Sequence, residues 1–276
     1  METTTPPRKQ TGLTRRSRVA FVGTGIAVAA AVMAVPLVTT QSDGKGPHVG
    51  LVIPEGWRTG QIYTAVDKVL GLPPGSTRKS LPKAHLKLPR DAQGNPEGYL
   101  FPASYPLHKG ASPESVLRFM VDTANKRFSG GTITAGAQRH ALTGYQAVTV
   151  ASIVQAEATT KADMAKVARV VFNRLERGMP LQMDSTLNYA LKRSTLRTSV
   201  KDTKIESPYN SYRSVGLPPT PISNPGEEAM RATINPAPGN WLYFVTVKPG
   251  DTRFTASYEE QQRNVAEFNR LRAAKK

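Results

Sequence analysis

The feature that most constrains this chain is an uncharged stretch near its N-terminus, from Val19 to Val38. A helix of about 20 such residues spans the hydrocarbon core of a bilayer. Five cations cluster before the stretch: Arg8, Lys9, Arg15, Arg16 and Arg18. The positive-inside rule therefore predicts a cytoplasmic tail over residues 1–18, one transmembrane helix over 19–38 and an extracytoplasmic C-terminal part at the cell membrane. A cleaved signal peptide is the alternative, but the apolar run exceeds a usual signal core.

The charge balance narrows the kind of partner. Lys and Arg number 37 against 20 Asp and Glu, for a net charge of +17, of which +13 lies beyond the tail. Such an excess favours nucleic acid, anionic lipid or an anionic wall polymer, and the position beyond a membrane argues against nucleic acid. The chain has no cysteine, which excludes disulfides and thiolate chemistry, and its four histidines lack metal-ligand spacing. We therefore expect neither a cofactor nor a metal.

Apolar spacing and turn residues divide the rest of the chain into parts. Residues 39–47 predict a polar linker, 48–90 a small strand-plus-helix unit, and 91–272 a larger mixed domain. Helical and strand patterns both occur without regular alternation, so the predicted fold class is α+β.

Local signals predict several elements of the larger domain. Ser112 followed by Pro113 predicts a helix start, and residues 129–136 predict a loop. Asn224 predicts the cap of a later helix, and residues 241–247 form the strongest strand pattern.

One carboxylate is placed unusually for a charge. Glu157 ends an otherwise uncharged helical run from Ala151, and the residues three, four and seven positions before it are apolar. Burial there would raise the pKa of the carboxyl and let it keep a proton near neutral pH, as a general acid requires. The alternative is an acid at a helix edge that reaches solvent or pairs with Arg169 or Arg174.

Other kinds of chemistry lack their motifs in this chain. There is no Gly-x-Ser-x-Gly elbow and no phosphate-binding loop. Carboxylate chemistry remains, and an acid among amides, hydroxyls and aromatic rings suits the cleavage of a glycosidic bond. Asp184 is the best candidate for a second acid, and a helix-cap aspartate is an equally good interpretation. Asn173 and Arg174, late in a helix, could simply bond the last carbonyls of that helix.

Several blocks, spaced in order along the chain, carry a family resemblance. They are residues 96–102 (PEGYLFP), 151–158 (ASIVQAEA), 167–175 (VARVVFNRL), 178–189 (GMPLQMDSTLNY), 207–212 (SPYNSY), 216–219 (GLPP), 221–226 (PISNPG) and 241–245 (WLYFV). Together they resemble the endolytic murein transglycosylases, the MltG or YceG-like family. The resemblance implies a single-pass membrane protein with a LysM-like module at 48–90 and a YceG-like catalytic domain at 91–272. It also implies cleavage of nascent peptidoglycan strands near peptidoglycan synthases.

The resemblance assigns catalysis to Glu157. In the family the second acid of a Glu-x-Glu pattern is catalytic, and the first is replaced here by Gln155. Histidines that the family tends to carry near Thr252 and Gln261 are also absent. The implied reaction uses one carboxylate as acid and then base, and leaves 1,6-anhydro ends without consuming water.

The sugar-binding wall is predicted from side-chain chemistry, since amides, hydroxyls and aromatic faces match a glycan. Its candidates are Gln182, Asp184, Thr186, Tyr189, Tyr209, Asn210 and Tyr212. Two alternative functions stay open: a catalytically weak wall-binding scaffold, and a muramidase that uses Asp184 as a second carboxylate.

Overall fold

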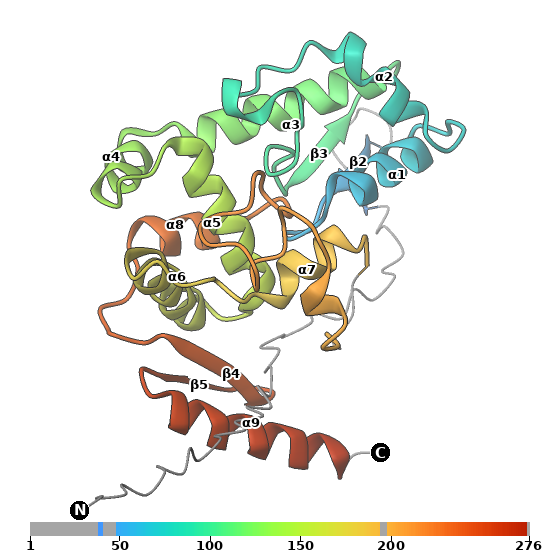
Figure 1. Ribbon diagram of the computed structural model, residues 1–276. Coiled ribbons are helices and arrows are strands. Elements are labelled where there is room, and N and C mark those ends of the chain that lie inside the picture. The colour runs from blue at the N-terminus through green and yellow to red at the C-terminus, as the bar shows by residue number, and fades with distance from the viewer. Residues whose placement is uncertain (1–37, 41–47, 194–197, 275–276) are drawn as a thin grey trace, which may run out of the picture.

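A computed structural model describes residues 38–40, 48–193 and 198–274, and confirms an α+β fold (Figure 1). The strands are β1 (Val38–Thr40), β2 (His48–Val52), β3 (Ser104–Leu107), β4 (Tyr243–Lys248) and β5 (Asp251–Thr255). The α-helices are α1 (Thr59–Val69), α2 (Ser76–Ala84), α3 (Pro113–Phe128), α4 (Gly131–Arg139), α5 (Gly144–Glu157), α6 (Lys161–Glu176), α7 (Asp184–Ala190), α8 (Glu227–Ile234) and α9 (Tyr258–Ala273). Short 3-10 turns are η1 (Arg90–Ala92) and η2 (Asp202–Lys204).

The predicted membrane span, residues 19–38, lies outside the described residues except for Val38, the first residue of β1. Most of the predicted linker lies outside them too. Among the helices that the structure does describe, none has the length and apolar character needed to cross a bilayer.

The N-terminal unit shares a sheet with the larger domain. Strand β2 pairs antiparallel with β1 on one side and with β3 on the other, where Leu51 lies opposite Tyr105. Helix α1 buries Ile62 and Val66 in the same apolar core that holds the central helices. The stretch from Ser76, in which no helix was predicted, forms α2 and packs against α1 and α3.

Helix α5 lies at the centre of the molecule and packs against α4, α6, α7 and α8 (Figure 1). Its start is a capping box, in which Thr143 Oγ1 accepts from the Gln146 amide at 3.2 Å and the Gln146 side chain accepts from the Thr143 amide at 2.9 Å. Most of its side chains are buried, so this helix is apolar nearly all round. The predicted start of α3 is confirmed, with Ser112 as the cap and Pro113 first.

Two local predictions were wrong because distant contacts outweigh local signals. Residues 131–139 form helix α4 where a loop was predicted, and Gly136 lets this helix approach α8 so closely that a Cβ would lie 2.5 Å from Ile234. Helix α8 begins at Glu227 without the predicted cap from Asn224. The Asn224 side chain instead accepts from the Leu100 amide at 2.7 Å and donates to the Trp57 carbonyl at 2.8 Å.

The C-terminal segment forms a hairpin and a helix, seen at the bottom of Figure 1. Strands β4 and β5 pair antiparallel, and α9 packs on them around Val245, Val247 and Val265. The other face contributes Phe244 to the main core. The strand predicted at 241–247 is confirmed as β4, shifted by two residues at its start.

Candidate active site

Glu157 is the last residue of α5, and its side chain is buried, with 1% of the residue exposed. Neither arginine of the alternative interpretation reaches it. Arg169 donates to the Ala237 carbonyl at 2.8 Å, and Arg174 donates to backbone carbonyls near α7 and β4. The Glu157 carboxyl therefore lies in the interior and pairs with neither of these two arginines, as the apolar face predicted.

The Glu157 carboxyl is held at one oxygen. Oε1 accepts a hydrogen bond of 3.2 Å from the backbone amide of Ser185, while Oε2 has no hydrogen-bond partner among the described residues. Burial raises the pKa of Glu157 to about 8, because the charged form loses hydration; nearby Asp184 raises the pKa further, and Ser185 opposes the shift. The group is thus protonated at neutral pH and can donate from the unpartnered oxygen.

Asp184 begins α7 directly beside the amide that holds Glu157. It is 3% exposed, and Tyr212 Oη donates to its Oδ1 at 2.6 Å. Burial raises the pKa of Asp184, and the tyrosine hydrogen bond opposes that rise. The predicted residues Asp184 and Tyr212 are therefore bonded to each other, and each interacts electrostatically with Glu157.

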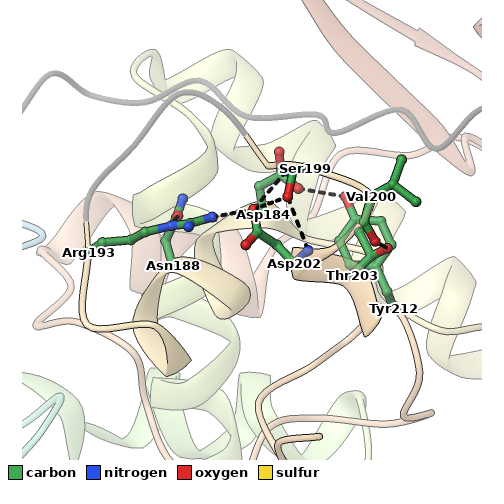
Figure 2. A network of polar contacts seen from close by, with 8 residues as sticks. All are labelled: Asp184, Asn188, Arg193, Ser199, Val200, Asp202, Thr203 and Tyr212. Carbon is green, nitrogen blue, oxygen red and sulfur yellow. Dashed lines mark hydrogen bonds and ion pairs between the residues drawn. The ribbon is translucent and has the colours of Figure 1, made fainter. Parts of the chain in front are cut away.

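A polar network beyond α7 is centred on Asp202 (Figure 2). Arg193 donates to Asp202 Oδ2 at 2.6 Å and to Asn188 Oδ1 at 3.2 Å. The amide and hydroxyl of Ser199 also donate to that aspartate oxygen, at 2.7 and 2.8 Å. These bonds, the one from Arg193 first, lower the pKa of Asp202 to about 2 and fix the chain on both sides of residues 194–197.

Helix α6 holds the chain that leads into α7. Arg174 is buried and donates to the carbonyls of Leu242, Pro180 and Leu181 at 2.6, 2.9 and 3.1 Å, and to Gln182 Oε1 at 3.1 Å. Asn173 Nδ2 donates to the carbonyls of residues 239 and 241. The suggestion that this pair bonds carbonyls of its own helix was wrong, because both side chains point across to other segments.

Gln155 occupies a different face of α5 from Glu157. Its side-chain oxygen accepts from the Gly226 amide at 3.0 Å and so fixes the loop before α8. A carboxylate could accept the same bond, so a glutamine preserves the contact. Because two residues along a helix turn about 200°, the Gln155 side chain does not point at the Glu157 carboxyl. The pKa of Glu157 rises through burial first, without a charge at residue 155.

The other predicted wall residues fall into two groups. Thr186 and Asn210 are fully buried and spend their polar atoms inside the protein: Thr186 Oγ1 donates to the Met183 carbonyl, and Asn210 Nδ2 donates to the carbonyls of residues 203 and 205. Gln182, with a positive φ of 54°, is held by Arg174. The polar groups of these three side chains are therefore bonded to other parts of the protein, and their role is to position the surrounding backbone.

Tyr189 and Tyr209 are half-buried, so both keep a part of the ring toward solvent. Their ring centroids are 4.9 Å apart with the planes tilted by 54°. Tyr209 Oη shares a hydrogen bond of 2.9 Å with Thr220 Oγ1. Of the seven predicted wall residues, these two keep an aromatic surface available to a sugar.

Glu97 is a buried acid that lies in the PEGYLFP block, and no role was predicted for it. It is 2% exposed and accepts from the Thr59 amide and hydroxyl, each at 3.1 Å, from Tyr189 Oη at 3.2 Å and from Asn224 Nδ2 at 3.1 Å. Burial raises its pKa to about 7 against the lowering effect of these bonds. The signal that could have found it is the one used for Glu157: a lone acid in an aromatic, apolar segment. Gly98, with a φ of 87°, follows it because a Cβ would lie 2.6 Å from Pro221.

The positions where the family tends to carry histidines lie in the C-terminal hairpin and helix. Thr252 Oγ1 shares a hydrogen bond of 2.9 Å with Thr246, across the hairpin. Gln261 is buried in α9 and donates to the Phe244 carbonyl at 3.1 Å. Both residues therefore serve the packing of this segment.

The fold and the site define an α+β protein with a buried carboxylic acid whose pKa is raised and a second buried acid beside it. The sequence model of the YceG-like family matches residues 28–267, so the chain belongs to the YceG-like family.

Solved and curated relatives agree with this assignment. The crystal structure of a YceG-like protein from Listeria monocytogenes superposes with a TM-score of 0.68 at 29% identity, covering 79% of this chain and 75% of that one. The endolytic murein transglycosylase of Bacillus subtilis (strain 168) is 37% identical over 60% of this chain and 46% of its own length. That of Streptococcus pneumoniae (serotype 2, strain D39) is 36% identical over 62% and 32%. The chain thus spans less than half the length of these curated relatives.

Proposed function

We propose that this protein is a membrane-anchored lytic transglycosylase that cuts peptidoglycan strands internally. The observation that carries the proposal is Glu157: a buried carboxyl with a pKa of about 8, one oxygen on the Ser185 amide, and the other without a partner among the described residues. The relatives named endolytic murein transglycosylase support the same reaction.

The reaction needs one carboxyl in two states. Protonated Glu157 gives its proton to the oxygen between N-acetylmuramic acid and N-acetylglucosamine as the bond from C1 to that oxygen breaks. The carboxylate then takes the proton of the muramoyl 6-hydroxyl as its oxygen bonds to C1. The products are a 1,6-anhydro end and a free 4-hydroxyl, and Glu157 regains its proton. General acid and base steps of this kind contribute roughly 10²–10⁴-fold each.

The surroundings of Glu157 supply what each state needs. Burial and the Asp184 charge favour the protonated form before the reaction, while the Ser185 amide stabilises the carboxylate formed during it. Because Glu157 is 1% exposed, a glycan reaches Oε2 only after the groups covering it move aside. The predicted anchor at residues 19–38 would keep this site close to newly made strands and their synthases.

The proposal is tested by digesting purified peptidoglycan with the full chain and with Glu157→Gln, and by identifying the new ends by mass spectrometry. We expect 1,6-anhydro ends that disappear in the variant. Reducing ends, lost in Asp184→Asn as well, would instead indicate a two-carboxylate muramidase. Binding without cleavage across pH and salt would indicate a wall-binding scaffold and overturn the enzymatic proposal.

A further inference from the structure

Arg58, just before α1, combines partial burial with unused donors. Its guanidinium lies 5.2 Å from the centre of the Tyr189 ring and donates through Nη1 to the Asn188 carbonyl at 3.2 Å. Its Nε and Nη2 make no hydrogen bond with the described residues, and it forms no ion pair with them within 4.0 Å. A planar cation stacked on a tyrosine with free N–H groups is suited to bind a carboxylate or phosphate.

The surface around this cation is held rigidly. Glu97 accepts from Tyr189 Oη and from both polar groups of Thr59, the residue after Arg58. Glu97 thereby fixes the start of α1 and the end of α7 relative to each other. Glu97 affects Arg58 through space, yet its two oxygens are occupied by these donors and by Asn224. The arginine fork is left for an external anion.

Arg58 and Glu157 both contact residues of α7. Ser185, which holds Glu157, and Tyr189, which stacks under Arg58, are four residues apart in α7, about 6 Å along the helix axis. Tyr209 extends the aromatic surface beside Tyr189. A ligand group of the strand bound at Glu157 is therefore within reach of Arg58.

We propose that Arg58, with the Tyr189 and Tyr209 rings, is a subsite for a carboxylate of the peptide stem on the glycan strand. The inference rests on the proposed function, and it concerns the peptide stem, a part of the substrate that the proposed step at Glu157 does not involve. The sugars next to the cleaved bond carry no free charge once the lactyl group is joined to a peptide, whereas the stem carries carboxylates. A bidentate bond between guanidinium and carboxylate is specific and strong when partly shielded from water. The subsite makes the protein prefer strands that carry stems.

The test measures binding, because cleavage would confuse recognition with catalysis. The full chain carrying Glu157→Gln is titrated with a defined muramoyl tetrasaccharide bearing peptide stems, and with a stem-free tetrasaccharide whose lactyl groups are capped as methylamides, so that the control ligand carries no carboxylate. Neither ligand carries a phosphate polymer. Arg58→Gln is compared with Arg58→Lys, which keeps the charge without the fork, and with Arg270→Gln, which removes an exposed charge from α9.

We expect Arg58→Gln to weaken binding of the stem-bearing ligand about tenfold and to leave the stem-free ligand unchanged, which corresponds to about 1.4 kcal/mol. Arg58→Lys should fall between, and Arg270→Gln should match the parent. Equal weakening for both ligands, or no change for either, would overturn the subsite, and melting temperatures show whether a loss comes from misfolding. If stems strengthen binding while the wild-type chain cuts nothing, the proposed function fails and the subsite stands. If the chain cuts strands but binds both ligands equally, the subsite fails and the proposed function stands.

Discussion

Burial of Glu157 costs stability once its carboxyl ionises, and the same burial supplies the protonated acid that the proposed reaction needs. Its folded-state pKa of about 8 lies above the ordinary 4.5, so the folded protein binds this proton more tightly than the unfolded chain. The associated stability is fully present below the unfolded pKa and is lost as the pH rises toward 8. Two consequences can be measured, one on stability and one on rate.

Replacing Glu157 by glutamine should stabilise the protein at alkaline pH. Glutamine keeps an oxygen for the Ser185 amide and cannot ionise, so the variant avoids the buried charge. We expect its free energy of unfolding to exceed that of the wild type by on the order of a few kcal/mol at pH 8, and the gain to shrink toward pH 4. Denaturant titrations at both pH values measure this. Glu176→Gln, at an exposed position in α6, is the control; a gain independent of pH would contradict the argument.

Cleavage should require the protonated acid and fall at high pH. We expect kcat/KM to be sustained below pH 8 and to drop about tenfold per pH unit above it, since this parameter reports the pKa of the free enzyme. Asp184 raises the pKa of Glu157. In Asp184→Asn, which retains an acceptor for Tyr212, the inflection should therefore move to lower pH. A profile that stays in place in this variant would remove Asp184 from the tuning of the acid.

At the scale of elements, the geometry of the candidate active site depends on how α6 positions the segment that leads into α7. The four hydrogen bonds of Arg174 run to the segment before α7 and to Leu242 at the start of the C-terminal hairpin, and its guanidinium also lies 5.1 Å from the Tyr243 ring centre. This one side chain ties together three segments that are separate in sequence. The position of the Ser185 amide at Glu157 follows from that tie.

Arg174→Lys should destabilise the fold strongly. Lysine lacks the planar fork and leaves buried carbonyls without donors. We expect a loss of about 3 kcal/mol in the free energy of unfolding, measured by denaturant titration. The matched control is Arg177→Lys, at an exposed position one turn of chain later, where we expect a change within about 0.5 kcal/mol. Equal effects would show that the fork contributes nothing specific.

Elements were predictable where the signal is local, and were missed where it is not. Ser112 and Pro113 start α3 through bonds within one turn, and Glu157 is recognisable because its own helix turns it inward. The role of Glu97 was not predicted because its hydrogen-bond donors come from residues 38, 92 and 127 positions away in the sequence. Asn224 was misassigned for the same reason: its amide serves distant backbone instead of the next helix.

At the scale of the whole molecule, the N-terminal unit and the larger domain are built together. β2 supplies the partner of β3, and Leu51, Ile62 and Val66 are fully buried in the core that also contains α5. Glu97 adds a polar junction through Thr59. The LysM-like character of residues 48–90 and the boundary at 90 remain predictions, but this shared core has a testable consequence.

A chain that starts at residue 91 should not fold cooperatively. It would expose the edge of β3 and open the core where the buried side chains of β2 and α1 are removed. We expect residues 91–276 to lack a sharp thermal transition by far-UV circular dichroism, whereas residues 48–276 should retain one. A cooperative transition in the shorter chain would show that the two parts are independent.

The near-complete burial of Glu157 also bears on which nucleophile wins. In the proposed reaction, water and the muramoyl 6-hydroxyl compete for the same anomeric carbon. Glu157 is 1% exposed before a glycan binds, so a bound strand would meet the acid with little water beside it, and the 6-hydroxyl arrives already attached to the sugar. We therefore expect the burial that raises the pKa of the acid also to favour the anhydro product. A substitution that admits water beside Glu157 should divert the proposed reaction from anhydro ends toward reducing ends before it abolishes cleavage.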